Sequence, residues 1–138
     1  MSALRTACRI SGLHFSTVSL TSAGLIISAQ TRAHQAVCPQ CGQTSSRLHG
    51  HYWRHPRDFP CGPQDTRLSI QVTWFRCLNP TCPAQTFSAQ GADIPRFARR
   101  TARLQTFLAH LGFGMGTERA DTFCHKAHIL AAQTPFLA

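Results

Sequence analysis

The sequence predicts a small α+β protein, and three patterns in its 138 residues support that prediction. Two pairs of closely spaced cysteines lie in the N-terminal part, an alternating apolar run lies between them, and an apolar helical periodicity follows Pro95. We expect residues 1–94 to form a β-hairpin plus a β-rich, metal-stabilised module, and residues 95–138 to form a helical segment. A structural metal is a common means by which so small a module becomes stable.

The first cysteine pair, Cys38 and Cys41, is separated by two residues, and the second, Cys77 and Cys82, by four. A turn of the first kind places both sulfurs on the same side, which supplies half of a tetrahedral zinc site with Zn–S distances of about 2.3 Å. We predict that the four thiolates bind one structural zinc ion in a zinc ribbon, where two cysteine turns clamp the metal. Four protein ligands leave no position for water, so the site is expected to hold shape and not to catalyse.

A redox dithiol at Cys38 and Cys41 is the competing interpretation. It is disfavoured because such a pair normally begins a helix within a βαβ pattern, which the sequence lacks. The other cysteines, Cys8, Cys61 and Cys124, are expected to be small buried apolar side chains. An odd number of cysteines grouped in short pairs favours a reducing compartment, so we expect a cytoplasmic location.

The N-terminal region predicts a β-hairpin. Apolar residues alternate with Ser and Thr from Leu13 to Leu20, a turn is expected from Thr21 to Gly24, and a second apolar run begins at Leu25. Neither run approaches the roughly 18 consecutive apolar residues of a membrane span, so no membrane partner is expected.

A strand is predicted from residue 67 to residue 75. There Leu68, Ile70, Val72 and Trp74 alternate with mainly polar residues and would share one buried face. The prolines, glycine and aspartates between residues 56 and 65 are expected to form loops and turns.

Pro95 is expected to begin a helix that the glycines at 112, 114 and 116 end. At 100° per residue, four arginines share one arc and apolar side chains occupy the neighbouring arc. These arginines are Arg96, Arg99, Arg100 and Arg103. No acidic residue lies between Pro95 and Met115, so phosphates opposite this face would explain its uncompensated charge. The tail from residue 117 is expected to be irregular or disordered, with a weak helix across residues 119–132.

Charge points to an anionic partner. Fourteen basic residues against five acidic ones give a formal net charge of +9, and Lys126 is the single lysine. Arginine presents a planar fork of donors that suits phosphate oxygens and guanine edges, so double-stranded DNA is the expected partner. The alternative is that a GC-rich genome inflates arginine usage and that the charges are merely solvated.

A second basic segment lies between the cysteine pairs, where histidines and arginines are interleaved with Tyr52 and Trp53. This mixture suits backbone phosphates and exposed bases, although the two aromatic residues would equally fill a small core beside the zinc site. The predicted DNA-binding residues of both basic segments are Arg47, His49, His51, Tyr52, Arg54, Arg57, Arg96, Arg99, Arg100 and Arg103.

Several sequence blocks, in the same order, resemble the N-terminal region of insertion-sequence transposases of the ISL-three type. The blocks are Cys38-Pro39-Gln40-Cys41-Gly42, Ser45-Ser46-Arg47-Leu48-His49, Asp58-Phe59-Pro60, Trp74-Phe75-Arg76-Cys77, Asn79-Pro80-Thr81-Cys82 and Phe97-Ala98-Arg99-Arg100-Thr101. The resemblance covers about residues 10 to 115. It implies a zinc finger, a helix-turn-helix opening at Pro95, and recognition of the element's terminal inverted repeats. It also implies a place at the nucleoid, with transposon ends, a second copy or a full-length transposase as partners.

Members of that family continue into a large catalytic domain in which three acidic residues hold divalent metal. Here the acidic residues are Asp58, Asp65, Asp93, Glu118 and Asp121, and three of them lie in or beside the predicted zinc module. Two-metal phosphoryl transfer needs converging carboxylates, so we expect a truncated member without enzymatic activity. The alternative function is a zinc-ribbon adaptor that binds an acidic protein surface.

Overall fold

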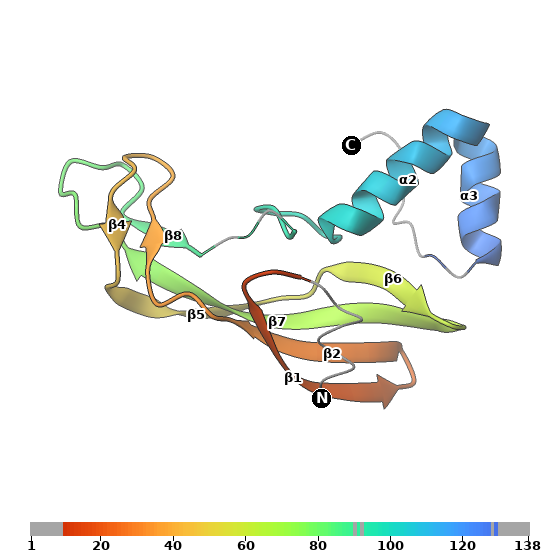
Figure 1. Cartoon of the computed structure of the whole chain (residues 1–138), viewed down its shortest axis with the longest axis horizontal. Helices are drawn as coiled ribbons and strands as arrows, with labels where there is room; N and C mark the ends of the chain where they lie inside the picture. The colour runs from red at the N-terminus through yellow and green to blue at the C-terminus, as the bar shows by residue number, and fades with distance from the viewer. Residues whose placement is uncertain (1–9, 90, 92, 128, 130–138) are drawn as a thin grey trace.

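The structure is a computed structural model, which describes residues 10–89, 91, 93–127 and 129. It shows a twisted sheet followed by two helices (Figure 1), which confirms the α+β class. The elements are β1 (Leu13–Thr21), β2 (Gly24–Thr31), β3 (Ala36–Val37), β4 (Thr44–Ser45), β5 (Leu48–Arg54), β6 (Arg57–Cys61), β7 (Gln64–Arg76), β8 (Thr86–Ser88), α2 (Ala102–Met115) and α3 (Thr117–Lys126).

The main sheet has the order β1-β2-β7-β5, and β6 and β8 also pair with β7. Only the β2–β7 pairing is parallel among the pairings of the described strands. The predicted N-terminal hairpin is confirmed, with Thr21 opposite Gly24 at its turn. Gly24 has φ +121°, and a Cβ there would lie 2.5 Å from the carbonyl oxygen of Asp65, so only glycine fits this close approach.

Strand β7 contributes to two separate cores. Its side chains Leu68, Ile70 and Val72 are buried in the first core, as predicted. The prediction for Trp74 is wrong: Trp74 is 38% exposed, whereas Phe75 is 1% exposed and belongs to the second core, beside the cysteines. Successive side chains of a strand point to opposite faces, so β7 serves the first core with one face and the second core with the other.

The predicted loop between residues 56 and 65 is in fact a strand with a short turn. Strand β6 pairs antiparallel with β7, so that Arg57 lies opposite Arg67 and Asp58 opposite Thr66. Proline is tolerated at edges of sheets, and Pro60 lies where the β6–β7 register is irregular. Of the three remaining cysteines, Cys124 is buried as expected, Cys61 is exposed, and Cys8 lies outside the described residues.

The predicted helix start at Pro95 is wrong, because α2 begins at Ala102. The side chain of Thr101 caps the helix by accepting a hydrogen bond from the N–H of Leu104. The backbone just before this cap is engaged elsewhere: the N–H of Arg57 donates to the Arg99 carbonyl, and that of Thr101 donates to the Arg57 carbonyl. A turn in which the N–H of Ala98 donates to the Pro95 carbonyl, followed by strand-like pairing of residues 99–101 with Arg57, therefore replaces the first two predicted helical turns. The predicted arginine arc does not exist, since Arg103 is its only helical member.

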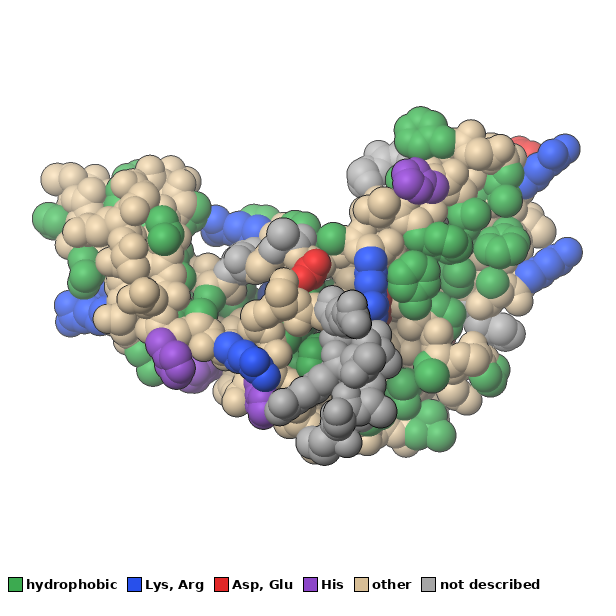
Figure 2. All heavy atoms as spheres, viewed as in Figure 1, with side chains coloured by type: hydrophobic (Ala, Val, Ile, Leu, Met, Phe, Trp, Pro, Cys, Tyr) green, Lys and Arg blue, Asp and Glu red, His purple; other side chains and the backbone are tan. Residues whose placement is uncertain are grey.

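The end of the chain is more ordered than expected. Helix α2 continues through two glycines and ends at Met115 with Gly116 as its C-cap, and residues 117–126 form α3 rather than an irregular tail. Residues 128 and 130–138, which complete the predicted tail, lie outside the described residues. The cysteine hairpins and the helices rise from opposite ends of the sheet on the same side, so the outline is concave between them (Figures 1 and 2).

A buried carboxylate joins the sheet to the helices. The side chain of Asp58, on β6, is 2% exposed and forms a salt bridge with Arg103 of α2. The Nε of Arg103 donates to Asp58 Oδ1 at 2.9 Å, and the hydroxyl of Thr101 donates to the same oxygen at 2.8 Å. Next to this link, Phe59 and Phe107 pack edge to face with ring centroids 5.3 Å apart.

Replacing Asp58 by Ala is expected to lower the free energy of unfolding by about 2 kcal/mol, because it leaves Arg103 without its carboxylate and Thr101 without its acceptor. Urea unfolding with metal present measures the change. Asp121→Ala, an exposed position on α3, is the matched control and should change stability by less than about 0.5 kcal/mol. Equal stabilities for the two variants would show that the buried link does not stabilise the fold.

Candidate metal centre

The first pair of ligand residues lies in the turn between β3 and β4. The N–H of Cys38 donates to the carbonyl of Gln43, and the N–H of Gly42 donates to the carbonyl of Cys38, both at 2.9 Å. Gly42 has φ +74°, a left-handed conformation that favours glycine. The Cys-Pro-Gln-Cys-Gly sequence therefore closes a tight knuckle whose two sulfurs emerge together.

The second pair lies between β7 and β8. The N–H of Cys77 donates to the carbonyl of Gln85 at 2.8 Å, and that of Cys82 donates to the carbonyl of Asn79 at 3.2 Å. The side-chain oxygen of Asn79 accepts hydrogen bonds from the N–H and the hydroxyl of Thr81, at 3.1 and 2.8 Å. These bonds shape the longer turn without a glycine.

A buried serine fixes the two knuckles relative to each other. The hydroxyl of Ser45, at the end of the first hairpin, donates to the carbonyl of Arg76 at 2.6 Å, one residue before Cys77. The same hydroxyl accepts from the N–H of Arg47, whose carbonyl in turn accepts from the N–H of Arg76. Phe75, which precedes Arg76, is buried in the second core together with Cys38, Cys82 and Phe87.

The four cysteine sulfurs converge with the geometry of a tetrahedral site. The Sγ atoms of Cys38 and Cys82 are 3.7 Å apart, those of Cys41 and Cys77 are 3.5 Å apart, and all four lie within 4.8 Å of one another. A disulfide would require about 2.05 Å, and all four thiols are free. Zn–S bonds of about 2.3 Å at tetrahedral angles place the sulfurs about 3.8 Å apart. The quartet thus fits a metal ion, and the predicted ligand set comes together as one site.

In the metal-free quartet the pKa of Cys38 is lowered, whereas the pKa values of Cys77 and Cys82 are raised. The backbone N–H of Cys41 lowers the pKa of Cys38 to about 7, against the opposing effect of burial. At Cys77 the backbone N–H of Asn79 acts in the lowering direction, but burial and the neighbouring thiols outweigh it and raise the pKa to about 12. Four adjacent thiolates need a cation among them, which a bound metal would supply.

The predicted DNA-binding residues of β5 lie along the edge next to the metal centre. Arg47, His49 and His51 are exposed, and the His49 ring stacks on Trp74 with centroids 5.7 Å apart. Tyr52 is partly buried, packing against the first core and against Trp74. The alternative, that Tyr52 and Trp53 fill the core beside the cysteines, is wrong: Tyr52 packs against the first core and Trp53 is 57% exposed. DNA contact by Arg47, His49, His51 and Tyr52 stays a prediction.

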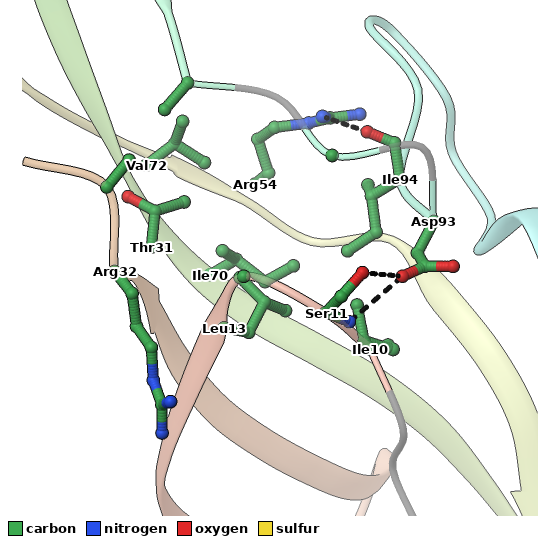
Figure 3. Close-up of a pocket in the computed structure, with 14 residues that line it drawn as sticks. Ile10, Ser11, Leu13, Thr31, Arg32, Arg54, Ile70, Val72, Asp93 and Ile94 are labelled. Carbon is green, nitrogen blue, oxygen red and sulfur yellow. Dashed lines mark hydrogen bonds between the residues drawn. The ribbon is translucent and has the colours of Figure 1, made fainter. Parts of the chain in front are cut away.

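Several predicted DNA-binding arginines are engaged within the protein. The guanidinium of Arg54 donates to the carbonyls of Ile94, Pro95 and Ala98, and Figure 3 shows it reaching the first of these. It lines a cavity of about 320 Å³ between the sheet and Gly91, Asp93 and Ile94. Arg103 is held by the buried carboxylate described above, so neither arginine is a simple surface cation.

The remaining basic residues divide between two places. Arg57, Arg99 and Arg100 line a second pocket, separate from the 320 Å³ cavity, which Arg54 also borders. Arg96 is exposed, with its guanidinium over the ring of Phe97. The pocket also contains Arg67 of β7, which the sequence analysis did not identify as a site residue. Its only sequence signal was a positive charge at an outward-facing position of the predicted strand.

Comparison with protein-family models, with curated proteins and with solved structures finds no match for this chain. The resemblance to transposases therefore stays an expectation from the sequence blocks. None of the helices in the described part of the chain combines the length and the apolar character needed to cross a membrane.

Elemental analysis of the purified protein is expected to find about one metal ion per chain, because one quartet binds one ion. Cys38→Ser and Cys82→Ser should each remove it and unfold the second core, since both side chains are buried there. Cys61→Ser is the matched control, an exposed cysteine outside the quartet that should keep full metal content. Full metal content in both quartet variants would contradict the site.

Metal affinity is expected to fall as the pH is lowered, because binding must displace protons from the thiols. The raised pKa of Cys77 means that its proton is still present at neutral pH in the metal-free protein. Each displaced proton should weaken apparent affinity about tenfold per pH unit below the pKa of its thiol. Competition with a coloured chelator between pH 5 and pH 8 measures this slope. A flat profile would mean that the thiols are not the ligands.

Proposed function

We propose that this chain is a zinc-dependent DNA-binding module that recognises insertion-sequence ends as the N-terminal part of a transposase. The observation that supports this best is the charge balance of +9, combined with the burial of one of its five carboxylates, Asp58, in an internal salt bridge. The acidic groups therefore do little to neutralise the surface. The sequence blocks shared with transposases supply the more specific part of the proposal, together with a place in the cytoplasm at the nucleoid.

Zinc is the metal we propose for the cysteine quartet. Tetrahedral sulfur sites bind zinc or iron, and structural zinc is commonly held by cysteines two to four residues apart. The ion would hold the two knuckles together and so position the β5 edge. Trp53 on that edge is 57% exposed, and the exposed His51 lies two residues before it on the same strand, which suits contact with phosphates and bases. The proposal assigns the metal a structural role and the chain no strand-transfer activity.

A protein-interaction adaptor is the second candidate, and the surface of the helices favours it. Phe113 is 91% exposed, Phe123 is 44% exposed and Met115 is 37% exposed. Hydrophobic side chains gather over this end of the molecule in the space-filling view (Figure 2). Exposed apolar groups of this kind are typical of surfaces that bind other proteins.

A salt titration tests the proposed function. The zinc-loaded protein should bind duplex DNA with an affinity whose logarithm falls linearly with the logarithm of salt concentration, by about 0.9 per phosphate neutralised. Fluorescence anisotropy with labelled duplexes, with and without a terminal inverted repeat, measures both the slope and the sequence preference. Chelation of the metal should abolish binding because the β5 edge loses its support.

Two outcomes separate the candidate functions. Absence of DNA binding, or binding that salt does not weaken, would reject the DNA-binding module. In the same assay, Phe113→Ser should leave DNA affinity unchanged, because this side chain lies on α2 far along the chain from the basic strands. If neither the wild type nor the Phe113→Ser variant binds DNA, and the variant loses protein partners that the wild type binds, the adaptor would be supported.

A further inference from the structure

The register of the sheet places three arginines side by side. Arg57 of β6 lies directly opposite Arg67 of β7, and on its other side it forms an isolated parallel bridge with Arg100. Like charges directly opposite each other on adjacent strands destabilise a sheet. The neighbouring Asp58 alternates to the other face of β6 and is engaged with Arg103.

These arginines line a pocket of about 350 Å³, which we call the arginine pocket. Its lining includes Arg54, Arg57, Arg67, Arg99 and Arg100 together with His55, and no acidic residue is among the described residues that form it. Burial lowers the pKa of Arg100, and the positive charge of Arg57 lowers it further. The site concentrates positive charge in a concave surface, where an anion would be attracted most strongly.

The backbone that carries the pocket is held firmly. Arg54 donates to the carbonyls of Ile94, Pro95 and Ala98, so one side chain fixes the segment before Arg99. The hydrogen bonds between Arg57 and residues 99 and 101 fix the segment after it. The backbone that carries these arginines is thus fixed before any ligand arrives, and the guanidinium of Arg100 donates to Gln105 Oε1 at 2.8 Å, which reduces the ordering cost of binding.

An aromatic ring lies at the rim of the arginine pocket in a strained conformation. Phe97 has φ +62°, the one described residue other than glycine with a positive φ, and its side chain is 84% exposed. The guanidinium of Arg96 lies over the ring, 4.9 Å from its centroid. Strained backbone clusters at ligand-binding sites, and burial does not explain this one because the ring faces solvent.

We propose that the arginine pocket binds a backbone phosphate of nucleic acid, and that Phe97 stacks on an unpaired base next to that phosphate. Arginine forks bind phosphate oxygens in pairs, and a base on an aromatic ring is the usual partner of such a phosphate in single-stranded segments. The inference rests on the proposed function and deepens it, since it assigns a distinct site for an unpaired nucleotide, as at a frayed or extended DNA end.

The test compares two variants that each remove two positive charges. Arg67→Gln with Arg99→Gln alters the arginine pocket at exposed side chains, and Arg119→Gln with Lys126→Gln alters exposed positions on α3. The pocket variant should bind duplex DNA with a three-nucleotide single-stranded extension at least about tenfold more weakly than wild type, with a salt slope reduced by about 1 to 2. The α3 variant should lose less than about threefold. Metal content should be unchanged in both variants. The free energy of unfolding in urea should be unchanged, or slightly higher in the pocket variant because Arg57 no longer faces a like charge at position 67.

The ring is tested with two probes. Phe97→Ala should weaken binding of the extended duplex at least about fivefold and leave a blunt duplex unaffected, whereas Phe97→Tyr, which keeps the ring, should restore binding.

Inorganic phosphate and a mononucleotide, titrated alone, test for a site that binds free phosphate. Tight binding of either, without binding of the oligonucleotides, would overturn the assignment to nucleic acid. Equal losses in the pocket and α3 variants would overturn the pocket while leaving the proposed function intact. No binding of either duplex by wild type would overturn both.

Discussion

Hydrogen bonding to β7 is the constraint on which the rest of the structure depends, because every other strand of the main sheet except β1 pairs with it. Its thirteen residues serve the first core through Leu68, Ile70 and Val72, and the second core through Phe75 on the opposite face. The strand then ends immediately before Cys77. A register shift of one residue would turn both apolar sets to the wrong faces and displace a metal ligand.

The same strand delivers the chain to the cysteine quartet. Four cysteine ligands would close a metal site there, so an ion would hold the two hairpins together and offer no position for a substrate. The groups capable of recognition lie on the elements that β7 and the metal position, namely the exposed β5 edge and the row formed by Arg67, Arg57 and Arg100. The proposed function thus assigns stability and recognition to different residues of one small sheet.

The segment before α2 shows how tertiary pairing overrides a local signal. Pro95 is a good first residue for a helix, and the periodicity beyond it is helical. Yet the backbone of Arg99 and Thr101 pairs with Arg57, and Asp58 accepts a hydrogen bond from the Thr101 hydroxyl. The helix therefore begins at Ala102, with Thr101 as its N-cap. Helix propensity contributes only a fraction of a kcal/mol per residue, which a buried carboxylate and two backbone hydrogen bonds readily exceed.

The sequence by itself determined the α+β class, the N-terminal hairpin, the buried face of Leu68 to Val72 and the two cysteine pairs that come together, because each depends on a pattern within a short stretch. Only the tertiary structure decided that Trp74 faces outward, that residues 57–61 form a strand, and that the arginines gather in a pocket instead of along a helix. These features depend on cross-strand register between residues far apart in the chain. Arg67 shows the difference most clearly, since nothing near it in sequence indicates that Arg57 lies opposite it.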